Sequence, residues 1–253
     1  MTKTVAIFTN YRTGSTAFTL LKSEEYDLPY GAELFSHERQ ARVGSIPSRH
    51  ELQTDYKIWQ YELCDLIQST ENLTTELKKK DTEICFKIMP TQVSTIQDNI
   101  NIANAVDKVY FLYSRNFIRT VKSWIAVRVD GGFASTGFKS PSRRYDIEKT
   151  KEIHLGRQGH GETHISTIDP KGPKLTGQLG QVSVNSLRKN IIENYERMAE
   201  IYHAVGGELI CMEEYFTEDK FNPYNKKIIW TEEPIIEDFD VESLFAIDIH
   251  NKL

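Results

Sequence analysis

Apolar residues follow two different spacings at the start of this chain. Lys3 to Thr9, KTVAIFT, is a short run of apolar and β-branched residues without polar alternation, as is typical of a strand covered on both faces of a parallel sheet. Thr16 to Glu24, TAFTLLKSE, then carries apolar residues at helical spacing, and Ser15 or Thr16 can cap that helix. The pattern therefore predicts a strand, a loop and a helix.

The same order of strand and helix returns further along the chain. Strand-like runs cover 82–90, 107–116 and 207–216, and helix-like segments cover 91–106, 117–129 and 186–205. Strands that alternate with helices indicate an α/β fold with a mostly parallel sheet, in which ligands bind at the carboxyl ends of the strands. We expect three layers, α/β/α, with a P-loop-like strand, loop and helix at the beginning.

The alternation stops between Asp130 and Gln181. Nine of the chain's 14 glycines fall within 131–180, mixed with Lys, Arg, His, Ser and Pro. Loops of this length in compact domains are usually functional or unstructured, so the pattern favours an active-site cover over a tolerated surface insertion. We therefore predict a single domain over 1–253, with 130–181 as an irregular glycine-rich insertion or active-site cover.

Composition narrows the kinds of partner. The chain of 253 residues is long enough for one good core, and its net charge of −5 gives no general attraction to nucleic acid or anionic membrane. No apolar segment reaches membrane-spanning length, and Cys64, Cys85 and Cys211 lie far apart without metal-ligand spacing. We expect a cytoplasmic protein with no membrane span, no nucleic-acid partner and no metal. Nothing in the pattern indicates an oligomeric state.

The loop after the first strand, NYRTGST, has the composition of an anion site. Backbone N–H groups and the helix dipole favour negative charge where a strand turns into a helix. Gly14 allows close backbone approach, the Ser15 and Thr16 hydroxyls can donate hydrogen bonds, and Arg12 can neutralise the anion. The nucleotide-triphosphatase motif GxxxxGK[ST] is absent, which disfavours ordinary ATP or GTP hydrolysis. A purely connecting turn is the alternative.

A second candidate anion site follows the strand at 107–116. Arg115 stands at its carboxyl end, and Ser123 comes eight residues later on the next helix. A guanidinium and a hydroxyl on one side of the sheet edge can grip an anion together. An Arg that caps the strand end and an ordinary exposed Ser are the alternative. Two such sites fit a ligand with two separated anionic groups.

Both motifs resemble segments of the sulfotransferase family. NYRTGST resembles its 5′-phosphosulfate-binding loop, and SRNFIRTVKSW resembles its 3′-phosphate-binding segment, in the expected order and about 100 residues apart. LICMEEYF is similar to a Tyr-Glu-Asp-like segment that is common in the family. Tyr11 stands where many members have Pro, and Thr13 replaces the usual Ser.

The resemblance implies a sulfotransferase-like fold and a specific reaction. The donor would be 3′-phosphoadenosine-5′-phosphosulfate (PAPS), the product 3′-phosphoadenosine-5′-phosphate (PAP), and the acceptor a hydroxyl or amine of a small molecule or carbohydrate, with no metal required. Arg12 would stabilise the leaving phosphate oxygen, the rest of its loop would hold the 5′-phosphosulfate, and Arg115 with Ser123 would hold the 3′-phosphate. The implied donor-binding residues are Arg12, Thr13, Gly14, Ser15, Thr16, Arg115 and Ser123.

The acceptor must also lose a proton, so a base is needed within reach of it. In some bacterial and carbohydrate sulfotransferases, including the trehalose-type enzymes, a Glu soon after the first helix is the proposed base, in a context similar to 31–35 here. We choose Glu33 first and His37 second, against the alternative that both are ordinary loop residues. Lys87, at the end of the second predicted strand, points toward the same edge; it can contact donor or acceptor, or pair with a carboxylate.

Two other classes of function stay open. A nucleotide kinase-like phosphotransferase would use the same loop for ATP, although the chain lacks the GK[ST] of that loop and a clear Asp for Mg²⁺ after a strand. A non-catalytic nucleotide-binding module would keep the fold and bind the anion without transfer.

Overall fold

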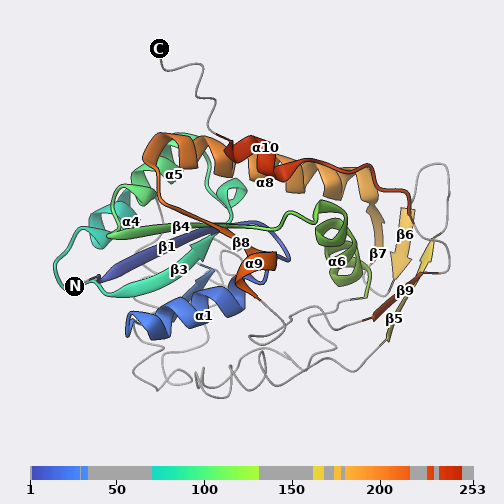
Figure 1. Cartoon of the computed structure of the whole chain (residues 1–253), viewed down its shortest axis with the longest axis horizontal. Coiled ribbons are helices and arrows are strands. Elements are labelled where there is room, and N and C mark those ends of the chain that lie inside the picture. Colours follow the sequence, from blue (N-terminus) through green and yellow to red (C-terminus); the bar gives the residue numbers. More distant parts are fainter. Residues whose placement is uncertain are drawn as a thin grey trace, which may run out of the picture.

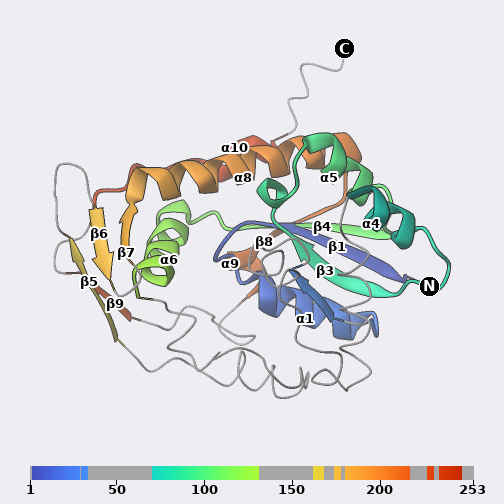
Figure 2. The ribbon, with the colours of Figure 1, turned by 180° about the vertical axis from the view of Figure 1, so that it is seen from behind.

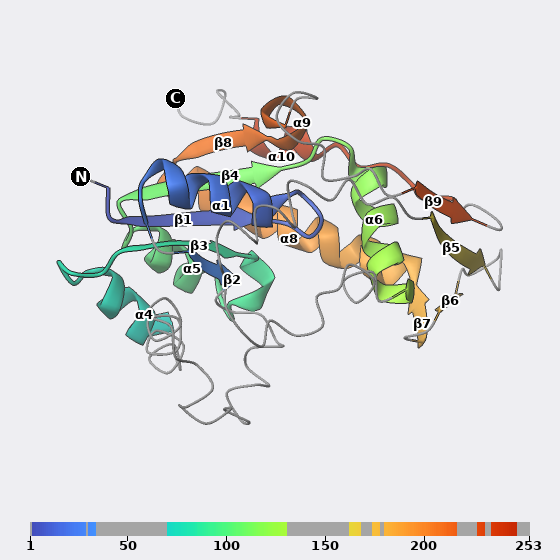
Figure 3. The same ribbon diagram turned by 90° about the horizontal axis from the view of Figure 1, so that it is seen from below.

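The computed structural model describes residues 2–28, 30–33, 70–130, 162–167, 174–177, 180–216, 227–230 and 234–246. Its main body is a five-stranded sheet in the order β2-β3-β1-β4-β8, and every neighbouring pair is parallel (Figures 1 and 3). The strands are β1 (Thr4–Thr9), β2 (Tyr30–Glu33), β3 (Ile84–Ile88), β4 (Lys108–Tyr113) and β8 (Glu208–Cys211). The prediction of an α/β fold with a mostly parallel sheet is confirmed.

Helices cover both faces of this sheet. One face carries α1 (Ser15–Glu25) and the short α9 (Met212–Tyr215), as Figure 3 shows from below. The long helix α8 runs across the other face (Figure 2). The helices packed there are α4 (Thr70–Leu77), α5 (Ile96–Ala103), α6 (Phe117–Asp130), α8 (Val184–Val205) and α10 (Val241–Phe245). None of the helices in these described ranges is long and apolar enough to cross a membrane.

The position of β1 inside the sheet explains why its sequence lacks polar alternation. All six of its residues are buried. Val5 and Ile7 pack with the α1 side, whereas Ala6 and Phe8 pack with the α8 side. Since successive side chains of a strand point to opposite faces, a strand covered on both faces needs apolar residues at every position.

The predicted elements are present, with shifted ends. The helix expected over 91–106 begins only at Ile96, because Thr95 has extended backbone and its side chain accepts a hydrogen bond from the N–H of Asp98, which caps the helix. The strand expected over 207–216 ends at Cys211, where α9 starts. The short edge strand β2 was not predicted, because its four residues, YGAE, carry little strand signal.

A second sheet lies beside α6, in the order β7-β6-β5-β9 (Figure 1). Its strands are β5 (Glu162–Thr167), β6 (Lys174–Gly177), β7 (Gly180–Ser183) and β9 (Lys227–Trp230). Three of them fall in or overlap the region predicted as irregular, and β5 pairs in parallel with the distant β9. Strands of four to six residues joined over such distances leave almost no local pattern. The rest of that region, 131–161, 168–173 and 178–179, lies outside the described residues.

Candidate functional site

The turn between β1 and α1 has an unusual backbone. Gly14 precedes α1 with φ 70° and ψ 14°, a left-handed conformation that glycine adopts without steric cost. Arg12 is also left-handed, with φ 60°, which costs a residue with a Cβ about 1 kcal/mol. Such strain persists only where the surroundings impose it, and it concentrates at functional sites. Arg12 is therefore held in place by its contacts.

Two buried amides of the core fix this turn. Asn10 is fully buried, and its Nδ2 donates to the carbonyl of Ile191 on α8 at 2.8 Å. Asn194, one turn further along α8, donates from Nδ2 to the carbonyl of Thr9 at 2.9 Å. Its Oδ1 accepts from the backbone N–H and the hydroxyl of Thr91, at 3.1 and 3.0 Å. Helix α8 thus ties the end of β1 to the turn that follows β3.

The hydroxyls of the turn have different roles. Thr13 is fully buried, and its Oγ1 lies 2.6 Å from that of Thr9 and 2.9 Å from the carbonyl of Asn10. Its side chain therefore stabilises the turn from inside. Ser15 and Thr16 stand in the first turn of α1, at the end of the helix that favours anions.

Lys87 brings a positive charge to these two hydroxyls. It comes from β3, where it pairs in register with Ile7 of β1, and it is only 7% exposed. Its Nζ lies 3.0 Å from Thr16 Oγ1 and 3.3 Å from Ser15 Oγ. The loop itself lacks the lysine of nucleotide triphosphatases, but a neighbouring strand supplies one beside the same hydroxyls.

The first motif contacts the second through helix α6. Arg12 Nε donates to Ser123 Oγ at 2.9 Å. Beside this bond, the rings of Tyr11 and Trp124 stack at 4.2 Å with an interplanar angle of 22°. Two consecutive loop residues therefore pack on two consecutive residues of α6. This contact explains how Arg12 is held in its left-handed conformation.

Arg115 points to other partners. Its guanidinium pairs with Glu214 of α9 and, at 3.1 Å, with Glu242 of α10, and its side chain is 46% exposed. The hydrogen bond to Glu214 raises the pKa of Arg115 above its ordinary value. Within the described residues, Arg115 and Ser123 thus bond to different groups. The structure groups Ser123 with Arg12, a pairing that the sequence did not predict.

A carboxylate occupies the turn after β4. Glu213 accepts from the Ser114 hydroxyl at 2.5 Å and from the backbone N–H groups of Arg115 and Asn116 at 3.1 and 3.4 Å. Burial disfavours its charged form, but the bonds from Ser114 and the backbone outweigh burial and lower the pKa of Glu213. Sequence reasoning missed this role, although two adjacent acids shortly after β8 are visible in LICMEEYF.

The structure gives less detail for the two candidate bases, Glu33 and His37. Glu33 ends β2, and its backbone is the register partner of Lys87 on β3. The backbone of Glu33 therefore lies beside that of Lys87. His37 lies outside the described residues. In the described part of the chain, no group of three or more His, Cys, Asp or Glu residues could hold a metal ion.

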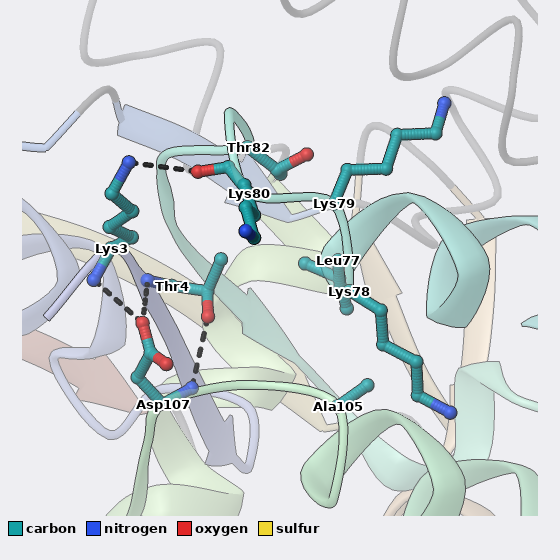
Figure 4. A pocket seen from close by; sticks show the side chains of 9 residues that line it. All are labelled: Lys3, Thr4, Leu77, Lys78, Lys79, Lys80, Thr82, Ala105 and Asp107. Carbon is teal, nitrogen blue, oxygen red and sulfur yellow. Dashed lines mark hydrogen bonds between the residues drawn. The ribbon is translucent and has the colours of Figure 1, made fainter.

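A cavity of about 430 Å³ lies at the amino ends of the strands, on the side of the sheet away from the Arg12 turn (Figure 4). Asp107, before β4, accepts from the backbone N–H groups of Lys3 and Thr4 at 2.7 and 3.0 Å, next to the amino end of β1. The cavity is lined by Lys3, Thr4, Leu77, Lys78, Lys79, Lys80, Thr82, Ala105 and Asp107. Since the turn with Arg12 follows the carboxyl end of β1, this cavity is not part of the candidate site.

No protein-family model and no curated protein matches this chain. Support for a function therefore comes from the chemistry and geometry of the residues above.

Proposed function

We propose that this protein is a sulfotransferase that moves the sulfuryl group of PAPS to a hydroxyl or amine of a small-molecule or carbohydrate acceptor. The observation that carries the proposal is the contact of Arg12 with Ser123, because it joins the two motifs of the resemblance at one place. Helices on both faces of a parallel sheet, and a strand that turns through Gly14 into α1, support a sulfotransferase-like three-layer fold with a P-loop-like loop.

The chemistry needs positive groups at the oxygen that leaves. In sulfuryl transfer the bond from sulfur to the bridging phosphate oxygen breaks, its electron pair stays on that oxygen, and the acceptor oxygen or nitrogen bonds to sulfur. Preorganised donors at a developing charge usually provide the largest part of catalysis. Arg12 meets this need, since the bond from its Nε to Ser123 orients its guanidinium.

Other residues of the turn would hold the 5′-phosphosulfate. Gly14 leaves space for close backbone approach, and the hydroxyls of Ser15 and Thr16 lie beside the ammonium group of Lys87. The proton of the acceptor would pass to Glu33, or to His37 as second choice. The proposal requires no metal, and it includes a cytoplasmic location and no nucleic-acid partner.

Thermal unfolding with nucleotides tests the proposal against its alternatives. A ligand that binds only the folded state stabilises it by about 2.7 kcal/mol at 100 times its Kd. We expect the unfolding temperature to rise with PAP, and not with ATP and Mg²⁺. A response to ATP and Mg²⁺ alone would favour the kinase-like alternative. Stabilisation by PAP without transfer from labelled PAPS to any of a broad panel of acceptors would favour the non-catalytic module.

A further inference from the structure

The second candidate anion site is occupied by carboxylates of the protein itself. Arg115 pairs with Glu214 of α9 and Glu242 of α10, which come 99 and 127 residues later in the chain. A third acid, Glu213, accepts a hydrogen bond from the backbone N–H group of Arg115. An anion that approaches this guanidinium therefore meets two competing acids.

The two outer acids can be displaced more easily than Glu213. The side chains of Glu214 and Glu242 are 66% and 49% exposed, and ion pairs at such exposure are weak. Glu213 is more buried and is held by backbone N–H groups as well as by Ser114. A phosphate with about two negative charges can bind the planar fork of Arg in a bidentate manner, so it competes well with single carboxylates. A neutral hydroxyl group carries no such charge, so it does not displace the carboxylates from Arg115.

From these contacts we infer that Glu214 and Glu242 compete with a 3′-phosphate for Arg115 and so lower the affinity of the second anion site. A phosphate must displace them to bind, whereas a group without that charge leaves them in place. This inference rests on the proposed function and deepens it, since it assigns to these two acids a control of the affinity for a nucleotide with a 3′-phosphate and no effect on one without.

Helix α10 need not leave the protein for this exchange. Val241 and Phe245, on either side of Glu242 in α10, are buried in the core beneath it. Of this helix, only the Glu242 side chain has to move, together with that of Glu214 on α9. Its Oε1 also accepts from the hydroxyl of Tyr113 at 3.0 Å, so the acid has a second partner when Arg115 leaves it.

Glutamine at both positions tests the inference. Glu214→Gln with Glu242→Gln removes the charges but keeps the shape, and the new amide oxygen beside Tyr113 can still accept from its hydroxyl. The measurement is calorimetric titration with PAP and with adenosine 5′-monophosphate, which lacks the 3′-phosphate. We expect the affinity for PAP to rise about twofold to tenfold, since two exposed pairs no longer compete, and the affinity for the monophosphate to stay unchanged.

A matched control removes one carboxylate from another arginine. Glu193→Gln takes the charged partner from Arg197, which it contacts on α8 at 3.0 Å, and should leave both affinities unchanged. If the double variant binds PAP no more tightly than the wild type, the inference is wrong and the proposed function stands. An equal rise for both nucleotides also overturns it, because the effect would be general electrostatics. If neither protein binds PAP, both proposals fail.

Discussion

The Nε of Arg12 donates a hydrogen bond of 2.9 Å to the hydroxyl of Ser123, across 111 residues of sequence. Arg12 lies in the turn after β1, and Ser123 lies in helix α6, which follows β4, the neighbour of β1 in the sheet. In a parallel sheet the segments that follow neighbouring strands meet at the carboxyl ends of the strands, where ligands of α/β proteins bind. A charged side chain with a left-handed backbone is thus fixed at the carboxyl ends of the strands.

Replacement of Arg12 should affect turnover more than binding. We expect Arg12→Ala to lower kcat about 100- to 1000-fold, as for the loss of one preorganised donor, with a small change in the Kd for PAP. The measurements are transfer from labelled PAPS to an acceptor found by screening, and calorimetry with PAP. Lys189→Ala, at an exposed position of α8, is the control. A loss of affinity as large as the loss of rate would contradict this role.

A double-mutant cycle tests whether Ser123 acts through Arg12. Ser123→Ala alone should lower kcat, because the guanidinium loses its fixed orientation. In the Arg12→Ala background the same substitution should have little further effect, since the group that it orients is gone. Additive losses of rate would show that Ser123 acts independently of Arg12, for example on the 3′-phosphate.

Lys87 is expected to contribute to anion affinity. Lys87→Met keeps most of the side-chain length and removes the charge beside Ser15 and Thr16. We expect the Kd for PAP to rise about tenfold, because a buried ammonium next to the anion is weakly screened. Calorimetry measures the Kd, and Lys87→Arg should retain more affinity. Unchanged binding by a folded Lys87→Met protein would remove Lys87 from the site.

Glu33 is the first choice of base, and its substitution should leave donor binding intact. We expect Glu33→Gln to lower kcat about 100- to 10,000-fold while the Kd for PAP stays the same, as for the loss of a general base. Rates with labelled PAPS measure this effect. The matched variant is His37→Ala: if it loses turnover and Glu33→Gln does not, the base is His37.

Four of the five strands of the main sheet, all except β2, could be predicted from the sequence because their signal is local. Each buried strand is a short apolar run followed by a helix with its own period, as at Lys3–Thr9. The second sheet could not, since β5 and β9 are short and pair across more than 60 residues. The helix start at Ile96 was missed because Thr91, Ser94 and Thr95 can each cap a helix, and only the structure shows that Thr95 does.

For the residues of the candidate site, the sequence indicated their positions along the strands and helices but not their contacts. Arg12, Ser15, Thr16, Arg115 and Ser123 all lie after the strands where the sequence placed them. Sequence spacing gives the position of a side chain along its element, but hydrogen-bond partners depend on how separate elements meet. The bond of Arg12 to Ser123 and the acids around Arg115 therefore appear only in three dimensions.

Glu213 should make the free energy of unfolding depend on pH in the acid range. Its folded pKa lies below the ordinary value of 4.5, so the ionised carboxylate stabilises the fold above pH 4.5, and this stabilisation is lost as the pH falls through the folded pKa. Glu213→Gln removes the titrating group. We expect it to lower the free energy of unfolding by about 1–2 kcal/mol at pH 7, and the difference from the wild type to shrink below pH 4.5.

Urea denaturation at a series of pH values from 7 to about 3 measures this difference. Glu214→Gln is the matched control, because it removes an adjacent, mostly exposed carboxylate that, among the described residues, contacts the Arg115 guanidinium and accepts from no backbone N–H group of the turn after β4. Its difference from the wild type should be small at every pH. If the Glu213→Gln curve runs parallel to the wild-type curve down to the lowest pH, the Glu213 carboxylate does not hold the turn that carries Arg115.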